Sequence, residues 1–356
     1  MVLTIQAGAK AYQHIRENGL SPADVTAIYG ASGAAKWLSI YGLDRAIFSD
    51  WLPHSSQLVD LFGTSVGAFK LAAATQRDPA AALLNLADAY IDQDYKNGST
   101  AKQVVKETNK IIDIVLSEQG VDDLLNNTRL RYHCASVRCL GGLASDQSAP
   151  QKIAMVKGFL QALAGRAYLR SSLERIIFHT GVSPSAINGR DQFFTQSVTL
   201  DKHNLHSAIL SSGSIPVVMA GVDNICGAPA GVYRDGGLLD YHANPANIGC
   251  RDGGIVLYPH FYPHLKECWF DKFFAWRKVS ATQLDNVVLV SPSESFVCSL
   301  PGGRISERQD FQRFRGRDQV RVQRWNEVKE RSLELGTAFL AIVNSGDIAA
   351  VLKPIE

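Results

Sequence analysis

The sequence predicts an α/β protein built around a mainly parallel sheet, and three observations indicate this. The apolar run at residues 25–29 ends in a glycine-containing loop that opens a helical pattern. A second apolar run, at residues 58–62, leads into Gly63-Thr64-Ser65-Val66-Gly67, and another helical pattern follows at once. The order is therefore strand, helix, strand, helix, which requires parallel strands joined by right-handed crossovers.

The first elements are justified by periodicity and punctuation. Residues 5–18 have helical periodicity, which ends at Gly19. The β-branched and aromatic residues at 25–29 predict a short buried strand, and a helix is expected from the loop at 30–37 to about residue 48. On this interpretation only one clear strand precedes the strand at 58–62.

The rest of the chain continues the alternation of helices and strands. Helical patterns are expected at 78–90, 100–116, near 121, 151–169 and 204–210. Strands are expected at 129–140, 175–179, 196–200, up to Asp235, at 255–258 and at 287–290. Residues 307–343 are charged and helical. No repeat or low-complexity linker interrupts the pattern, so we expect a single domain over 1–356, with 304–345 as its charged C-terminal helical part.

Composition excludes several classes of function. The chain has 356 residues with 36 basic and 34 acidic side chains, so no overall charge favours nucleic acid as a partner. No apolar stretch reaches the roughly 20 residues of a membrane-spanning helix, and the first residues do not resemble a signal peptide. The six cysteines show no C-x-x-C spacing, which is typical of a reducing compartment. We therefore expect a cytoplasmic protein without a metal site or cofactor.

The strongest chemical signal is the G-x-S-x-G sequence that contains Ser65. Between a strand and a helix this pattern forms a sharp turn that exposes the serine hydroxyl, and Gly63 and Gly67 leave room for the close approach of strand and helix. The N–H groups at the start of the following helix point toward whatever Ser65 attacks. Ser65 is thus a candidate nucleophile, although a serine at this position could also simply cap the helix.

Three ordered motifs together resemble the patatin-like phospholipases over residues 25–245. They are the Gly30–Gly33 loop, the Ser65 turn, and Tyr233-Arg234-Asp235-Gly236-Gly237, which is approached by the serine-rich run 211–216. The resemblance implies a three-layer αβα sandwich and a catalytic pair in which Ser65 is the nucleophile and Asp235 the base. It implies an oxyanion hole formed by backbone N–H groups of Gly30, Ala31, Ser32 and Gly33. The implied activity is hydrolysis of a lipid ester or phospholipid through an acyl-enzyme intermediate, with peripheral membrane contact and no cofactor.

Three alternatives remain open. An α/β-hydrolase-type esterase would use Ser65, Asp235 and one of the histidines that follow, which are His242, His260 and His264. Ser32 could be the nucleophile, with residues 8–10 as its oxyanion loop. The glycine-poor loop at 30–33 also allows a non-catalytic lipid-binding protein of the same fold. The aromatic stretch 258–276 is expected to be core, or else a lid or acyl-chain wall over Ser65.

Overall fold

The strands of the protein join into one twisted sheet. The structure, a computed structural model, describes residues 1–95, 100–181, 187–249 and 253–356. In this part of the chain eleven strands form the sheet, in the order β11-β1-β10-β9-β2-β3-β4-β5-β6, with β8 paired to β4 and β7 to β8. The strands are β1 (Leu3–Ala7), β2 (Val25–Gly30), β3 (Val59–Gly63), β4 (Leu130–Cys139), β5 (Leu173–His179), β6 (Thr195–Thr199), β7 (Val222–Asp223), β8 (Val232–Asp235), β9 (Ile255–Pro259), β10 (Val287–Pro292) and β11 (Leu352–Pro354).

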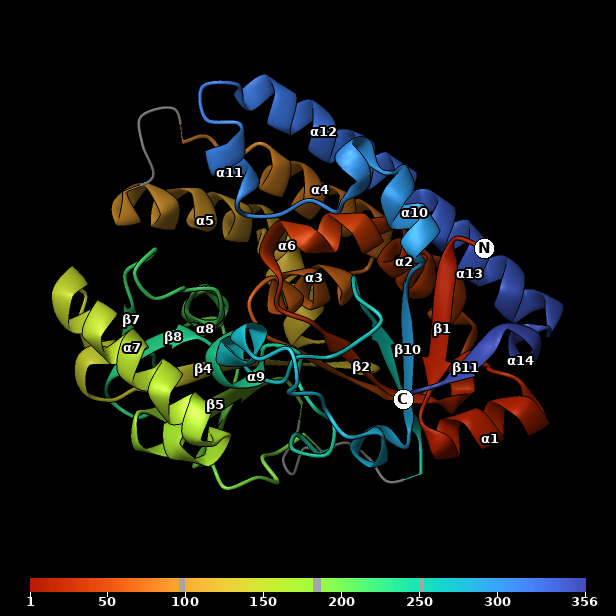
Figure 1. Cartoon of the computed structure of the whole chain (residues 1–356), viewed down its shortest axis with the longest axis horizontal. Helices are drawn as coiled ribbons and strands as arrows, with labels where there is room; N and C mark the ends of the chain where they lie inside the picture. The colour runs from red at the N-terminus through yellow and green to blue at the C-terminus, as the bar shows by residue number, and fades with distance from the viewer. Residues whose placement is uncertain (96–99, 182–186, 250–252) are drawn as a thin grey trace.

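Helices fill most of the connections between the strands (Figure 1). They are α1 (Ala9–Asn18), α2 (Tyr41–Arg45), α3 (Val66–Ala74), α4 (Pro79–Ile91), α5 (Ala101–Val115), α6 (Glu118–Leu125), α7 (Ser148–Ala164), α8 (Leu205–Ser212), α9 (Gly237–Asp240), α10 (Glu294–Ser299), α11 (Asp310–Arg313), α12 (Asp318–Arg331), α13 (Leu333–Ser345) and α14 (Ile348–Val351). Short 3₁₀ helices include η2 (Ala34–Ile40) and η7 (Trp269–Phe273).

The centre of the sheet is parallel, as the sequence predicts. Strands β10, β9, β2, β3 and β4 all run in the same direction. The two sides are mixed, because β1 is antiparallel to β10, and both β5 and β8 are antiparallel to β4. The prediction of an α/β protein with a mainly parallel central sheet is confirmed.

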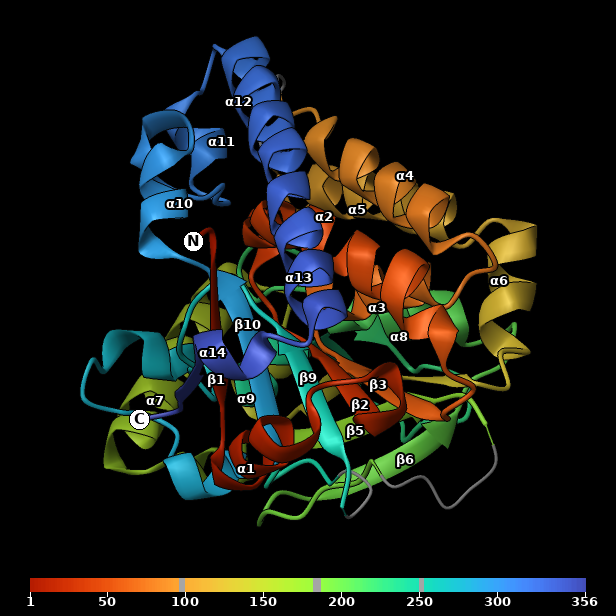
Figure 2. The ribbon, with the colours of Figure 1, turned by 90° about the vertical axis from the view of Figure 1, so that its right-hand side faces the viewer.

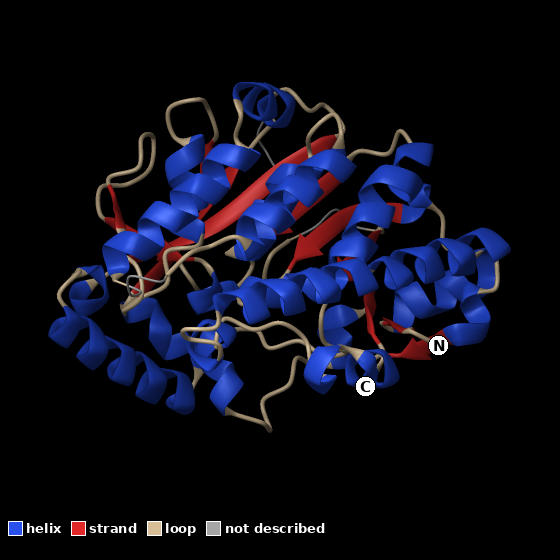
Figure 3. Cartoon of the chain, turned by 90° about the horizontal axis from the view of Figure 1, so that it is seen from above, coloured by secondary structure: helices blue, strands red, loops and turns tan. Residues whose placement is uncertain are grey.

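Helices cover both faces of the sheet, and β4 shows how alternate side chains reach the two layers (Figure 3). The Tyr132 hydroxyl donates to the carbonyl of Ala68 in α3, and the Ser136 hydroxyl bonds with that of Ser211 in α8. Val137 and Cys139 face the other way and join a second apolar cluster with residues of α7, α9 and η7. The arrangement is that of three layers.

The predicted helix at residues 5–18 is wrong in its first part. Residues 3–7 form β1, in which Leu3, Ile5 and Ala7 are buried while the two residues between them are only partly buried. Such a short apolar pattern fits a period of two as well as a helical period, and pairing with β10 and β11 selects the strand. Two strands, and not one, therefore precede β3.

The charged C-terminal region lies back on the N-terminal half of the chain. Figures 1 and 2 show α12 and α13 along the outside of α2 and α4. Arg321 donates to the carbonyl of Ile91 at 2.8 Å, and the Lys329 ammonium lies 2.7 Å from the Asp88 carboxylate. This packing brings residues 307–312, which precede α12, to the cavity described below.

Candidate active site

Strand β4 brings the two predicted site residues together. Along one edge of β4, the last residue of β3, Gly63, pairs with Cys134, and the last residue of β8, Asp235, pairs with Ser136. Since β3 and β8 run toward each other on this edge, their ends meet. The Ser65 hydroxyl, two residues beyond β3, donates to the Oδ2 atom of Asp235 at 2.9 Å.

Ser65 occupies a strained turn. Its φ of 53° and ψ of −133° lie in a region that costs side-chain-bearing residues about 1–3 kcal/mol, a strain often stored at functional sites. The flanking glycines allow the turn to pack closely. A Cβ atom on Gly67 would lie 2.1 Å from the carbonyl oxygen of Gly30, and one on Gly63 would lie 2.5 Å from the carbonyl carbon of Gly67. The backbone geometry therefore requires both glycines of the G-x-S-x-G sequence.

The serine-rich end of α8 holds the backbone of both residues. The N–H of Ser65 donates to the carbonyl oxygen and to the hydroxyl of Ser212, each at 3.0 Å. The N–H of Asp235 donates to the carbonyl of Ser214 at 3.0 Å, and that of Gly236 to the carbonyl of Ser212 at 3.3 Å. The run at 211–214 thus fixes the distance between the turn and the carboxylate.

Asp235 is buried without a cation in direct contact in the part of the chain that the structure describes. Burial raises the pKa of its carboxyl to about 6, although hydrogen bonds from the Gly237 N–H and the Ser65 hydroxyl act in the opposite direction. The Gly237 N–H lies 2.7 Å from Oδ1, so the carboxylate is oriented with Oδ2 toward Ser65. A carboxylate with such a pKa can accept a proton near neutral pH.

The loop that was predicted to form the oxyanion hole lies beside Ser65, and its N–H groups are not equivalent. The N–H of Ser32 donates to the carbonyl of Tyr241 at 2.9 Å, so it is already used. Gly33 and Ala34 line the cavity that contains Ser65, and Ala34 has a φ of 53°. The candidate donors at this edge of the cavity are therefore the N–H groups of Gly33 and Ala34, together with that of Val66 at the start of α3.

Two cavities meet at Ser65, each of about 500 Å³. The first is lined by charged and polar groups such as Lys36, Lys272 and Glu307, together with Trp269. The second extends between α3, α4, α5 and α11, and polar side chains such as Gln93, Thr108 and Gln312 are interspersed with its apolar ones. Its apolar lining includes Phe69, Tyr90, Val104, Ile111, Met219 and Phe311. Cavities of this volume hold small organic ligands, and both cavities offer apolar as well as polar groups to a substrate.

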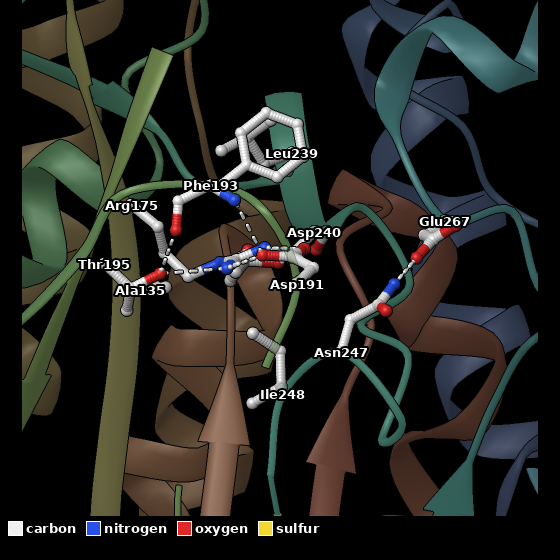
Figure 4. Close-up of polar contacts among 12 residues, drawn as sticks. Ala135, Arg175, Asp191, Phe193, Thr195, Leu239, Asp240, Asn247, Ile248 and Glu267 are labelled. Atoms are coloured by element: carbon white, nitrogen blue, oxygen red, sulfur yellow. Dashed lines mark hydrogen bonds and ion pairs between the residues drawn. The ribbon is translucent and has the colours of Figure 1, made fainter. Parts of the chain in front are cut away.

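An ion-pair network lies directly behind α9, which follows Asp235 in the chain (Figure 4). The buried guanidinium of Arg175 bonds with both oxygens of Asp240, at 2.7 and 3.0 Å, and with both oxygens of Asp191, each at 2.9 Å. Arg166 contacts the same two carboxylates at 2.9 and 3.4 Å. The Asp240 carbonyl also accepts a hydrogen bond from the Thr64 hydroxyl at 2.7 Å, which connects this network to the residue before Ser65.

The histidines proposed for a triad have other contacts. The Nδ1 atom of His242 accepts the Lys266 N–H at 2.8 Å, and Nδ1 of His260 bonds with the backbone of Tyr262. Burial lowers the pKa of His260 to about 3 and that of His242 well below its usual value. His264 stacks on Tyr262. Because Ser65 bonds directly with Asp235, no histidine lies between them.

The alternative nucleophile, Ser32, has no carboxylate or imidazole as a partner among the described residues. Its hydroxyl bonds with the hydroxyl of Thr64 at 2.7 Å and with the Thr64 carbonyl at 3.1 Å. These contacts fix the loop against the residue that precedes Ser65. The structure therefore gives Ser32 a supporting position beside the Ser65 turn.

Several residues around Ser65 were not found from the sequence. Lys272 comes from the aromatic stretch 258–276, Met155 from α7, and Arg308 and Gln309 from the C-terminal part. They are single residues without a motif, and only the folded chain brings them together. The aromatic stretch itself is divided. Phe261 and Phe270 are buried in the core and Trp269 lines the cavity, whereas Phe273 and Trp276 are exposed.

Neither a metal-binding cluster nor a membrane-spanning helix occurs in the part of the chain that the structure describes. No group of three His, Cys, Asp or Glu side chains there could hold a metal ion. No helix of this part of the chain is long and apolar enough to cross a membrane. Compared with the models of known protein families and with curated proteins, the chain matches none.

Proposed function

We propose that the protein is a lipid acyl hydrolase, a carboxylic-ester hydrolase of the patatin-like type, in which Ser65 and Asp235 form the catalytic pair. The observation that carries this proposal is the 2.9 Å hydrogen bond from the Ser65 hydroxyl to Asp235, at a strained turn that opens into both cavities. The apolar side chains that line part of the second cavity suit an acyl chain. The cytoplasm is the proposed location, since the five described cysteines are free thiols.

The proposed reaction has two steps. Asp235 accepts the hydroxyl proton as the Ser65 oxygen attacks the ester carbonyl carbon, and backbone N–H groups of Gly33, Ala34 and Val66 stabilise the oxyanion. The ester bond then breaks, and the leaving alcohol takes the proton from Asp235. In the second step water attacks the acyl-enzyme, Asp235 again accepts a proton, and the acid leaves Ser65 with its hydroxyl restored.

Reaction with a fluorophosphonate probe tests this assignment. We expect labelling of the wild-type protein and of Ser32→Ala, and its loss in Ser65→Ala and Asp235→Asn. Loss in Ser32→Ala alone would place the nucleophile in the earlier loop. Absence of labelling in the wild-type protein would favour the non-catalytic lipid-binding alternative.

Single replacements of the three histidines distinguish the Ser–Asp pair from a Ser–Asp–His triad. If Ser65 and Asp235 act without a histidine, His242→Ala, His260→Ala and His264→Ala should each keep ester hydrolysis per folded molecule. The loss of hydrolysis in one of them, with its fold retained by circular dichroism, would instead favour a Ser–Asp–His triad. His242 and His260 are buried, so their replacement by alanine leaves cavities that can destabilise the fold. Activity is therefore compared per folded molecule.

A further inference from the structure

Helix α7 exposes its larger apolar side chains and buries its small ones. Its buried residues are Gln151, Gly158 and Ala162. A Cβ atom on Gly158 would lie 2.8 Å from the ring of Phe270, so a small residue is needed there for the helix to pack. The exposed side chains are Ile153 at 70%, Val156 at 61%, Leu160 at 57% and Leu163 at 48%. This orientation is the reverse of that usual for a surface helix.

The exposed stripe continues onto the end of η7 and the residues that follow it. The ring of Phe159, on α7, lies 5.7 Å from that of Phe273 and 5.3 Å from that of Phe274. Phe273 is 57% exposed, and Trp276, whose ring lies 5.3 Å from Phe274, is 72% exposed. We call these residues of α7 and the following segment the apolar face: Ile153, Val156, Leu160, Leu163, Phe273 and Trp276.

The apolar face adjoins the entrance to the Ser65 cavity. Met155, from the same helix, lines that cavity, and so do Trp269 and Lys272 from η7. The ring of Trp269 also lies 5.4 Å from that of Phe273. A surface that covered the apolar face would therefore also lie against the opening that leads to Ser65. Figure 1 shows α7 at the outside of the molecule, and α7 contacts η7.

The charges around the apolar face are positive. Helix α7 contains no aspartate or glutamate, and its Lys152 and Lys157 are exposed. Arg170 and Lys278 are exposed nearby in the chain, and none of these four side chains forms an ion pair within the described residues. An amphipathic helix with exposed apolar residues and flanking lysines is typical of a surface that binds anionic lipid headgroups. Lysine is depleted at protein–protein interfaces, which makes a protein partner less suitable.

We propose that the apolar face binds the surface of a lipid bilayer that contains anionic headgroups, and that this contact presents the Ser65 cavity to lipid. The role of this contact in lipid hydrolysis rests on the proposed function, but the binding of the apolar face to a bilayer needs no reaction at Ser65. The apolar side chains would enter the boundary between headgroups and acyl chains, and the lysines would contact the phosphates. Binding should therefore weaken as salt is added.

Sedimentation with vesicles tests the proposal. The wild-type protein should pellet with vesicles of equal parts phosphatidylcholine and phosphatidylglycerol. The affinity of the double variant Ile153→Gln/Leu160→Gln for the vesicles should be lower by a factor of about ten or more, because two apolar side chains no longer enter the lipid. The matched control is Leu84→Gln/Ile114→Gln, which changes two exposed apolar residues of α4 and α5 outside the apolar face. The control should bind like the wild-type protein.

Three results would overturn the proposal. They are the absence of wild-type protein from the vesicle pellet, equal loss of binding in both double variants, and a concentration-dependent dimer that only Ile153→Gln/Leu160→Gln abolishes. The last result would show that a second copy of the chain covers the apolar face. Both double variants change exposed residues only, so we expect them to fold like the wild-type protein. Thermal unfolding verifies this.

A second pair of measurements separates this proposal from the proposed function. Ser65→Ala should still bind vesicles while it hydrolyses no ester. Ile153→Gln/Leu160→Gln should hydrolyse the soluble monomeric ester p-nitrophenyl butyrate at the wild-type rate, but cleave vesicle lipid about tenfold more slowly. Hydrolysis of the soluble ester without vesicle binding would overturn only the inference. Vesicle binding without hydrolysis of any ester would overturn only the proposed function.

Discussion

The carboxylates of Asp235 and Asp191 differ in how their charge is compensated. Asp235, which contacts Ser65, has hydrogen-bond donors but no ion pair among the described residues, and burial raises its pKa to about 6. Asp191 lies in the arginine network behind α9. Burial alone would raise the pKa of Asp191, but hydrogen bonds and charge from Arg175 and Arg166 hold it below its usual value.

The difference indicates separate tasks. A carboxylate bound by two guanidinium groups is a poor proton acceptor, but it can hold two segments of chain in place. A buried carboxylate without a cation is costly for stability and becomes a better base. The network fixes Asp240 at the end of α9, and α9 begins two residues after Asp235. The strong ion pairs thus support the position of Asp235 without contacting it.

The largest effect should come from removal of the uncompensated charge. Asp235→Asn keeps the size of the side chain but cannot accept the proton of Ser65, so we expect ester hydrolysis to fall about 10²–10⁴-fold. The variant should unfold at the same temperature as the wild-type protein or at a higher one at neutral pH, because no buried charge remains. Steady-state kinetics and calorimetry give the two values. A strongly destabilised variant would contradict the comparison.

The next largest effect should be on stability. Arg175→Met leaves two buried carboxylates without their main partner, so we expect the free energy of unfolding to fall by about 3–5 kcal/mol. Denaturant titration measures it. The matched control is Arg138→Met, which breaks a more exposed ion pair with Glu174 between β4 and β5, at a cost of about 1 kcal/mol or less. Equal losses in the two variants would show that the network has no special role.

The sequence predicts the parallel core of the fold because its strand–helix alternation is local. It does not predict β1, whose five residues become a strand only through β10 and β11 at the other end of the chain. Ser65 and Asp235 could be predicted as neighbours from ordered motifs, and the structure brings them into contact. Whether they react stays a prediction.

The arginine network and the orientation of α7 could not be predicted, for physical reasons. Arg166, Arg175, Asp191 and Asp240 have no characteristic spacing, and their proximity depends on how β5, the chain before β6, and α9 pack. For α7, the apolar period at 153, 156, 160 and 163 predicts a helix with one apolar side. The period does not tell whether this side faces the core or the solvent.

The pH dependence should distinguish the two carboxylates. If Asp235 is the base, as proposed, it acts only when ionised, so hydrolysis of a soluble ester should fall about tenfold per pH unit below pH 6. Stability should follow the same group. In the unfolded chain this carboxyl titrates near 3.9, so between about pH 4 and 6 the folded state holds a proton that the unfolded state has lost. The contribution of Asp235 to the free energy of unfolding therefore falls as the pH rises through this window and is constant above it.

Comparison with Asp235→Asn isolates that contribution. From pH 4 to pH 6.5 the variant should gain stability relative to the wild-type protein, on the order of 3 kcal/mol. Denaturant titrations at several pH values would show it. An acid limb of activity near pH 4, together with a stability difference that does not change with pH, would indicate that Asp235 is as well compensated as Asp191.

The smallest effect should come from Lys272, whose charge reaches Asp235 through space. Lys272 lines the cavity, and its ammonium lies 3.6 Å from the centre of the Tyr241 ring. Desolvation, together with the positive charge of Lys36, lowers the pKa of Lys272 to about 7, so Lys272 carries its charge at pH 5–6, where Asp235 titrates. That positive charge favours ionised Asp235. Lys272→Met should therefore raise the pKa of Asp235 and move the acid limb of hydrolysis upward by a fraction of a pH unit.

The control for this variant is Lys278→Met, which removes an exposed lysine six residues further along that does not line the cavity. Its acid limb should coincide with that of the wild-type protein, measured on the same soluble ester at constant ionic strength. A limb that moves downward in Lys272→Met, or equally in both variants, would mean that the charges lining the cavity do not set the basicity of Asp235. Burial and the hydrogen bonds from Gly237 and Ser65 would then set the pKa of Asp235. The difference between Asp235 and Asp191 would depend on the two arginines beside Asp191.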